Sequence, residues 1–103
     1  MPSAPADLAT FEANTAKVAD ILRALANERR LMVLCKLAEG GEERVGALAE
    51  AAGLSQSAAS QHLAKMREEG VLATRRDAQT VYYRIADPNA ARLLTLLKSI
   101  YCP

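Results

Sequence analysis

Gly53 separates two short segments that each have the periodicity of an amphipathic helix. Apolar side chains recur at three- and four-residue intervals in residues 45–52, and Ser55 is a suitable N-cap for a second helix that ends at Gly70. Two helices joined by so short a glycine-containing turn form a helix-turn-helix. This motif constrains the rest of the chain, because the remaining segments must supply the core on which the two helices pack.

The second of these helices has an apolar face and a small polar face. At about 100° per residue, Ala59, Leu63 and Met66 point to one side and form a core-facing stripe. The opposite side carries hydroxyls and carboxamides, which can enter a major groove and hydrogen-bond to base edges. An ordinary solvated face is the alternative. The predicted DNA contacts are Ser57, Ser60 and Gln61 as base-reading residues, with Gln56 and His62 as positioning contacts.

Residues 71–76 and 80–85 alternate in side-chain type around Asp77-Ala78-Gln79, which predicts a β-hairpin. The hairpin lies in the more basic part of the chain, since residues 60–103 carry seven basic and four acidic side chains. A basic hairpin directly after a helix-turn-helix extends its DNA footprint as a wing that reaches phosphates or an adjacent minor groove. A charged, solvated sheet edge is the alternative. The predicted wing contacts are Arg75, Arg76 and Arg84.

Helices are also predicted on both sides of this unit. An apolar stripe marks residues 8–25, Asn27 caps the next helix, and Asp87-Pro88 opens a last helix that ends near Tyr101. The fold class is therefore mainly α with a β-hairpin wing, a winged helix-turn-helix of order α-α-α-α-β-β-α. Residues 1–103 make one domain, with residues 1–7 frayed. The terminal helices carry more apolar surface than one small core needs, which predicts a homodimer through them.

The same sequence argues against several function classes. The chain opens without a signal-peptide pattern and contains no run of about 18 apolar residues, so a cytoplasmic protein without membrane contact is expected. An enzyme is not expected, because a cysteine nucleophile needs an activating base and His62, the sole histidine, belongs to the proposed DNA face. No cofactor is expected either.

Three segments of the chain, in this order, resemble the ArsR family of bacterial repressors. They are residues 25–31 (Leu-Ala-Asn-Glu-Arg-Arg-Leu), 54–63 (Leu-Ser-Gln-Ser-Ala-Ala-Ser-Gln-His-Leu) and 75–84 (Arg-Arg-Asp-Ala-Gln-Thr-Val-Tyr-Tyr-Arg). The resemblance extends from about Leu8 to Pro103. It implies a dimeric winged-helix repressor that binds double-stranded operator DNA and leaves it when an inducer binds.

Many members of that family sense a metal through a Cys-x-Cys pair in the third helix or through Asp and His ligands in the last. Residues 45–52 contain no cysteine and residues 88–101 contain no histidine. The usual soft and imidazole donors are missing, so no metal site is expected. For His62, packing or a phosphate contact is the favoured role.

Cys35 and Cys102 are similar to the thiol pair of the persulfide-responsive branch of the family, the BigR/SqrR type with HlyU-like relatives. This similarity implies that oxidation or sulfur bridging joins the two thiols and lowers operator affinity, with reactive sulfur species as the inducer. A core position is the alternative for Cys35, which lies in an apolar stripe. A response to peroxide or a metal ion, and a winged helix that binds only protein, also stay open.

Two single residues carry expectations of their own. Ala78 stands where related wings often have glycine, and alanine is costly at positive φ, so a different wing-tip conformation is expected. Lys98 precedes Cys102 by one turn and is expected to favour a thiolate there, whereas the helix dipole opposes it.

Overall fold

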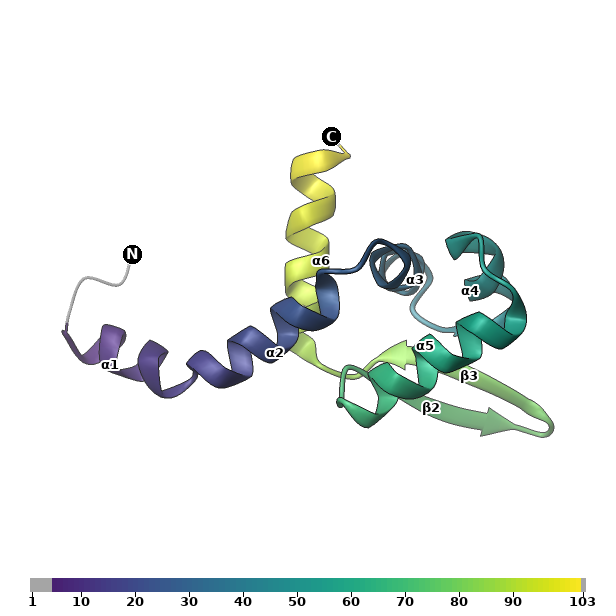
Figure 1. The fold of residues 1–103 in the computed structure, drawn as a ribbon, viewed down its shortest axis with the longest axis horizontal. Helices are drawn as coiled ribbons and strands as arrows, with labels where there is room; N and C mark the ends of the chain where they lie inside the picture. The colour runs from purple at the N-terminus through teal and green to yellow at the C-terminus, as the bar shows by residue number, and fades with distance from the viewer. Residues whose placement is uncertain (1–4, 103) are drawn as a thin grey trace.

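The computed structural model describes residues 5–102. Its elements in chain order are α1 (Pro5–Ala13), α2 (Thr15–Leu25), α3 (Glu28–Gly40), β1 (Glu43–Arg44), α4 (Val45–Ala52), α5 (Gln56–Glu68), β2 (Leu72–Asp77), β3 (Thr80–Ile85) and α6 (Pro88–Tyr101). Figure 1 shows α1 and α2 as an arm on one side of the molecule and the β2–β3 hairpin projecting on the other. The predicted class, mainly helical with a β-hairpin after a helix-turn-helix, is confirmed. The fraying predicted for residues 1–7 falls partly outside the described residues, and residues 5–7 belong to α1.

Three helices begin at the capping residues that the sequence predicts. Asn27 and Ser55 each accept a hydrogen bond from the backbone N–H three residues later, both at 3.1 Å. Asp87 accepts from two amides in the first turn of α6, where Pro88 needs no acceptor. Each bond satisfies an amide that the helix itself leaves unpaired. Local sequence therefore determines where α3, α5 and α6 start.

Residues 8–25, predicted as one helix, form two helices that are interrupted at Asn14. The Asn14 side-chain amide donates to the Thr10 carbonyl oxygen at 2.9 Å, and the Thr15 hydroxyl donates to the Phe11 carbonyl oxygen at 3.2 Å. Asn and Thr side chains that bond to the preceding turn compete with regular helical geometry. The prediction of a single helix is wrong at this position for that reason.

The sheet has a third strand that the sequence analysis did not predict. β1 pairs antiparallel with β3, with Glu43 opposite Tyr83 and Arg44 opposite Tyr82, so the strand order is β1-β3-β2. A strand of two residues is too short to display an alternating pattern of apolar and polar side chains. Its partner, Tyr83, is half-buried and packs against the core.

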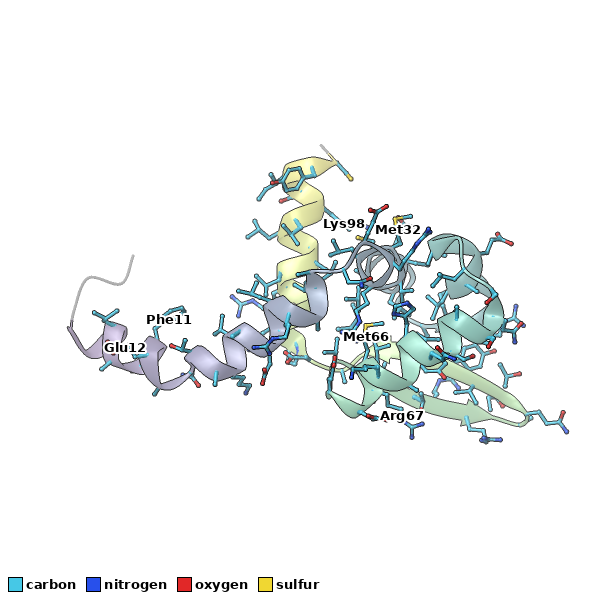
Figure 2. The ribbon with its side chains drawn as sticks, viewed as in Figure 1. Phe11, Glu12, Met32, Met66, Arg67 and Lys98 are labelled. Carbon is cyan, nitrogen blue, oxygen red and sulfur yellow. The ribbon has the colours of Figure 1, made fainter. Side chains whose placement is uncertain are left out.

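The core is organised around α3, which packs on α2, α4, α6 and the sheet. Figure 2 shows Met66 pointing from α5 toward α3. The largest fully buried side chains come from α3, α4, α5 and α6: Val33, Leu34, Leu37, Leu48, Leu63, Met66 and Leu94. Burial of one such side chain contributes about 1.5–3 kcal/mol, so this set is the main source of the fold's stability.

Large apolar side chains also remain outside this core. On α6 Ala90 and Leu94 are buried in the core, whereas Leu96 and Ile100 are 53% and 56% exposed. On the arm, Leu8, Phe11 and Leu22 are exposed in the same way, and Figure 2 shows Phe11 far from the core. Surplus apolar surface is thus concentrated on α1, α2 and α6, the terminal helices from which the sequence predicts a dimer.

Candidate DNA interface and thiol pair

α4, the turn after it and α5 form the helix-turn-helix. Gly53 ends α4 with a left-handed φ of 65°, a conformation that favours glycine. The Arg29 guanidinium of α3 donates a hydrogen bond to the Ala52 carbonyl oxygen at 2.6 Å, and this bond ties the start of the turn to α3. Arg30 forms an ion pair of 3.1 Å with Glu69 at the other end of α5. Consecutive arginines of α3 therefore hold the end of α4 and the C-terminal end of α5.

The side chains of α5 divide as predicted. Ala59, Leu63 and Met66 are fully buried, and His62 is half-buried. The predicted DNA contacts Gln56, Ser57, Ser60 and Gln61 are all exposed. The exposed set presents hydroxyl and carboxamide groups from the first two turns of α5, an arrangement suited to reading base edges.

Two clefts flank α5. One, of about 780 Å³, lies between α2 and α5 and is lined by Gln61, His62 and Lys65 among others. The other, of about 740 Å³, lies between α4, Ser60 and the wing tip, and Arg44, Gln79 and Thr80 also line it. α5 is therefore a ridge with a cleft on each side. The sequence analysis did not name Lys65, although its position one turn after Gln61 would have indicated it.

The three wing arginines do not share one face of the sheet. Arg75 lies opposite Tyr82 and Arg84 opposite Ala73, whereas Arg76 lies opposite Val81. Cross-strand partners point to the same side of a sheet and neighbours along a strand to opposite sides. Arg75 and Arg84 therefore share one face, and Arg76 projects from the other, near the wing tip.

Arg75 is already engaged within the protein. Its Nε donates to both carboxylate oxygens of Glu42, at 2.9 and 3.0 Å, and its guanidinium lies 4.5 Å from the centre of the Tyr82 ring. The hydrogen bond from Arg75 lowers the pKa of the Glu42 carboxyl, and Arg84 acts on it in the same direction. Glu42 was not considered in the sequence analysis, and a partner 33 residues away leaves no local signal. Of the three wing arginines, Arg75 is therefore the one held in an ion pair within the described residues, whereas Arg76 lies on the other face of the sheet, opposite Val81.

Ala78 has a φ of 55°, the only positive φ of a non-glycine residue in the described part of the chain. Ala78 thus has the positive φ that a glycine would have at this position. The different wing-tip conformation that the sequence predicts is not seen in the φ angle of Ala78. Both common two-residue hairpin loops require a positive φ at their first residue. Ala78 carries the strain of that geometry.

Replacing Ala78 with glycine should raise the free energy of unfolding by about 1 kcal/mol, because the left-handed strain of an L-residue exceeds the added entropy of the unfolded chain. Urea denaturation followed by circular dichroism measures it. Ala73→Gly, at an ordinary strand position, is the matched control and should lower stability. A destabilised Ala78→Gly variant would contradict the strain argument.

Cys35 lies on α3 and Cys102 directly follows α6, two helices that pack on each other, and both cysteines are free thiols. Cys35 is half-buried against the core, whereas Cys102 is the exposed C-cap of α6. Burial raises the pKa of the Cys35 thiol; Lys98 acts to lower it, and Cys102 and Glu39 act to raise it. Cys102 therefore lies within electrostatic reach of Cys35, although 67 positions separate them in the sequence.

Among residues 5–102, no three His, Cys, Asp or Glu side chains gather as a metal-ion site. In the same part of the chain, every helix is too short or too polar to cross a bilayer.

Known proteins resemble this chain in sequence and in structure. Residues 27–74 match the family described as bacterial regulatory protein, arsR family. The transcriptional activator HlyU of Vibrio cholerae is 44% identical over 99% of this chain and 94% of its own length. The HTH-type transcriptional regulator YgaV of Escherichia coli is 39% identical over 94% of this chain and 98% of its own.

Solved structures agree with these sequence relatives. Reduced HlyU from Vibrio cholerae superimposes with a TM-score of 0.83 at 45% identity, covering 91% of this chain and 98% of that one. The transcriptional repressor BigR from Xylella fastidiosa gives 0.81 at 37% identity, covering 91% and 95%. These relatives are transcriptional regulators rather than enzymes, as the sequence predicts. The chain belongs to the ArsR family of winged-helix transcriptional regulators.

Proposed function

We propose that the protein is a homodimeric repressor, acting in the cytoplasm, whose affinity for double-stranded operator DNA falls when Cys35 and Cys102 become joined by a disulfide or a longer polysulfide. The observation that carries this proposal is the placement of the two thiols on helices that pack together, Cys35 on α3 and Cys102 at the end of α6, within electrostatic reach of each other. Reactive sulfur species are the proposed inducers, because a thiolate attacks the S–S bond of a persulfide. Resemblance to BigR, which is described as a transcriptional repressor, supports repression, whereas HlyU is described as a transcriptional activator.

The proposed DNA face consists of α5 and the wing. Exposed Ser57, Ser60 and Gln61 read base edges in the major groove, and Gln56 and His62 position the helix. On the wing, Arg76 is the main phosphate anchor, because Arg75 is held by Glu42 and Arg84 shares its face. Lys65 lines the cleft between α2 and α5 and is proposed as a further contact to the DNA backbone.

The proposed route from thiols to DNA runs through α3. Arg29 of α3 holds the end of α4 before the turn, Arg30 holds the C-terminal end of α5, and α6 carries the exposed Leu96 and Ile100 proposed for dimerisation. A covalent bridge between α3 and α6 therefore ties the reading unit to the dimer element. A small rotation there changes the separation of two recognition helices, which must match successive major grooves about 34 Å apart.

A direct test measures operator binding by the wild-type protein when reduced, after a persulfide donor and after peroxide, with the intact mass of each sample. The proposal expects weaker binding in samples whose mass shows loss of two hydrogens or gain of bridging sulfur. A response to peroxide but not to the persulfide donor identifies a peroxide sensor instead. A bridged protein that binds the operator as tightly as the reduced one contradicts the proposal.

Arg76→Ala should reduce the slope of log affinity against log salt concentration by about one, since one phosphate contact is lost. Arg75→Ala is the matched control: it removes the same charge from the adjacent position, and its slope should stay close to that of the wild type. Titrations of operator DNA at four salt concentrations measure both slopes. Equal changes in the two variants contradict the assignment of Arg76.

Base reading is distinguished from phosphate anchoring by a second comparison. Gln61→Ala should weaken binding to the operator by about 1–3 kcal/mol and leave binding to random DNA unchanged. Equal losses on the two DNAs would place Gln61 among the phosphate contacts.

A further inference from the structure

An ion pair joins α3 and α6 beside the two thiols. Lys98 Nζ lies 3.6 Å from Glu39 Oε2. Glu39 follows Cys35 by one turn on α3, and Lys98 precedes Cys102 by one turn on α6. Figure 2 shows Lys98 between the two helices. Each helix thus presents one thiol and one charged group at the same contact.

Lys98 is the cation that acts on Cys35. The groups that act electrostatically on this thiol are Lys98 and Cys102 from α6 and Glu39 from α3 itself, and Lys98 has the largest effect of the three. Lys98 alone favours the thiolate, against burial, Glu39 and Cys102. Only about a third of the Lys98 side chain is exposed, so solvent screens its charge less than at a free surface. The sequence analysis considered Lys98 only in relation to Cys102. In the structure, its ion pair with Glu39 brings the Lys98 ammonium to α3, the helix of Cys35.

We propose that Lys98 is the positioning residue of the thiol switch: its ammonium, held against α3 by Glu39, stabilises the Cys35 thiolate that closes the sulfur bridge. This inference rests on the proposed function. It adds a residue that determines how fast the bridge forms near neutral pH, because a thiolate and not a thiol is the nucleophile.

The bridge forms in two displacement steps. The exposed Cys102 thiolate attacks the outer sulfur of a persulfide donor; the donor's S–S bond breaks, its thiolate leaves, and Cys102 becomes a persulfide. The Cys35 thiolate then attacks Sγ of Cys102, the S–S bond of that persulfide breaks, and hydrosulfide leaves. The two thiols are oxidised and the donor's outer sulfur is reduced to sulfide. Lys98 acts on the second step, in which Cys35 must have lost its proton.

Bridge closure is measured by intact mass after a pulse of persulfide donor, over a range of pH. In Lys98→Met, closure near neutral pH should be roughly three- to tenfold slower than in the wild type, the Cys102 persulfide should accumulate, and the rate profile should move to higher pH. Lys98→Arg keeps the positive charge and should stay close to the wild-type profile.

A charge-swapped variant distinguishes two roles of Lys98: an electrostatic effect on Cys35, and an ion pair that only holds α3 and α6 together. Glu39→Lys/Lys98→Glu can re-form the ion pair, but it places a carboxylate at the position that acts more strongly on Cys35. Closure should remain slow in this double variant. Wild-type rates in the double variant, or an unmoved pH profile in Lys98→Met, overturn the proposal.

A second readout does not require a bridge. In a Cys102→Ser background, the reaction of Cys35 with iodoacetamide reports its thiolate fraction directly, and Lys98→Met should slow it near neutral pH by a similar factor. If the wild type forms no bridge, or keeps its operator when bridged, the proposed function fails while this measurement still decides the role of Lys98. An unchanged alkylation profile overturns that role.

Discussion

Replacing either Cys35 or Cys102 with serine should abolish the response to persulfide while leaving the reduced protein's operator affinity within about twofold of wild type. Serine is close to cysteine in size but forms no sulfur bridge, so the tie between α3 and α6 cannot form. A coupling of about 1–3 kcal/mol corresponds to a roughly 5- to 150-fold loss of wild-type affinity after treatment. Operator titrations before and after a persulfide donor measure this difference.

The two substitutions differ in their effect on folding. Cys102 is exposed, so Cys102→Ser should leave stability unchanged, whereas Cys35 packs against the core and a hydroxyl there is less favourable. Cys35→Ala is the matched control for packing, because it removes the sulfur without adding a polar group. A variant that lacks either cysteine and still releases DNA as readily as the wild type would show that the bridge is not the switch.

The parts of the fold that sequence predicts here are those determined locally. The caps at Asn27, Ser55 and Asp87 begin helices at the predicted residues, because a cap bond forms within one turn. The burial of Ala59, Leu63 and Met66 follows from helical periodicity, so the exposed face of α5 was predicted as well. The break at Asn14 was missed because the apolar stripe continues through it.

The parts of the candidate site that sequence did not predict depend on distant partners. Arg75, Arg76 and Arg84 look equivalent in the sequence, but β1 brings Glu42 to Arg75, and strand register puts Arg76 on the other face. The ion pair of Lys98 with Glu39 was not predicted for the same reason, since Glu39 lies on another helix, and its action on Cys35 was missed with it. The role of each of these charged side chains therefore depends on partners from other helices and strands, which the local sequence does not reveal.

Leu96→Glu should convert the proposed dimer to a folded monomer and weaken operator binding by about 10²–10⁴-fold, because a monomer binds one half-site and loses the effective concentration of the second. Leu96 is half-exposed on α6 and lies outside the core, so a carboxylate there should not unfold the chain. Sedimentation equilibrium measures the oligomeric state, and titrations with full and half operators measure the loss. Affinity for a half operator should hardly change.

Two variants of the same helix separate assembly from folding. Thr95→Glu introduces the same charge at an exposed neighbouring position and should leave the dimer intact if the interface follows the apolar stripe. Leu94→Ala truncates a fully buried side chain and should lower the free energy of unfolding by about 2–5 kcal/mol. If Leu96→Glu remains dimeric with full operator affinity, the exposed apolar residues of α6, Leu96 and Ile100, do not form the interface. The bridge between α3 and α6 would then need another route to the DNA, since α6 would no longer link the thiols to the spacing of the two recognition helices.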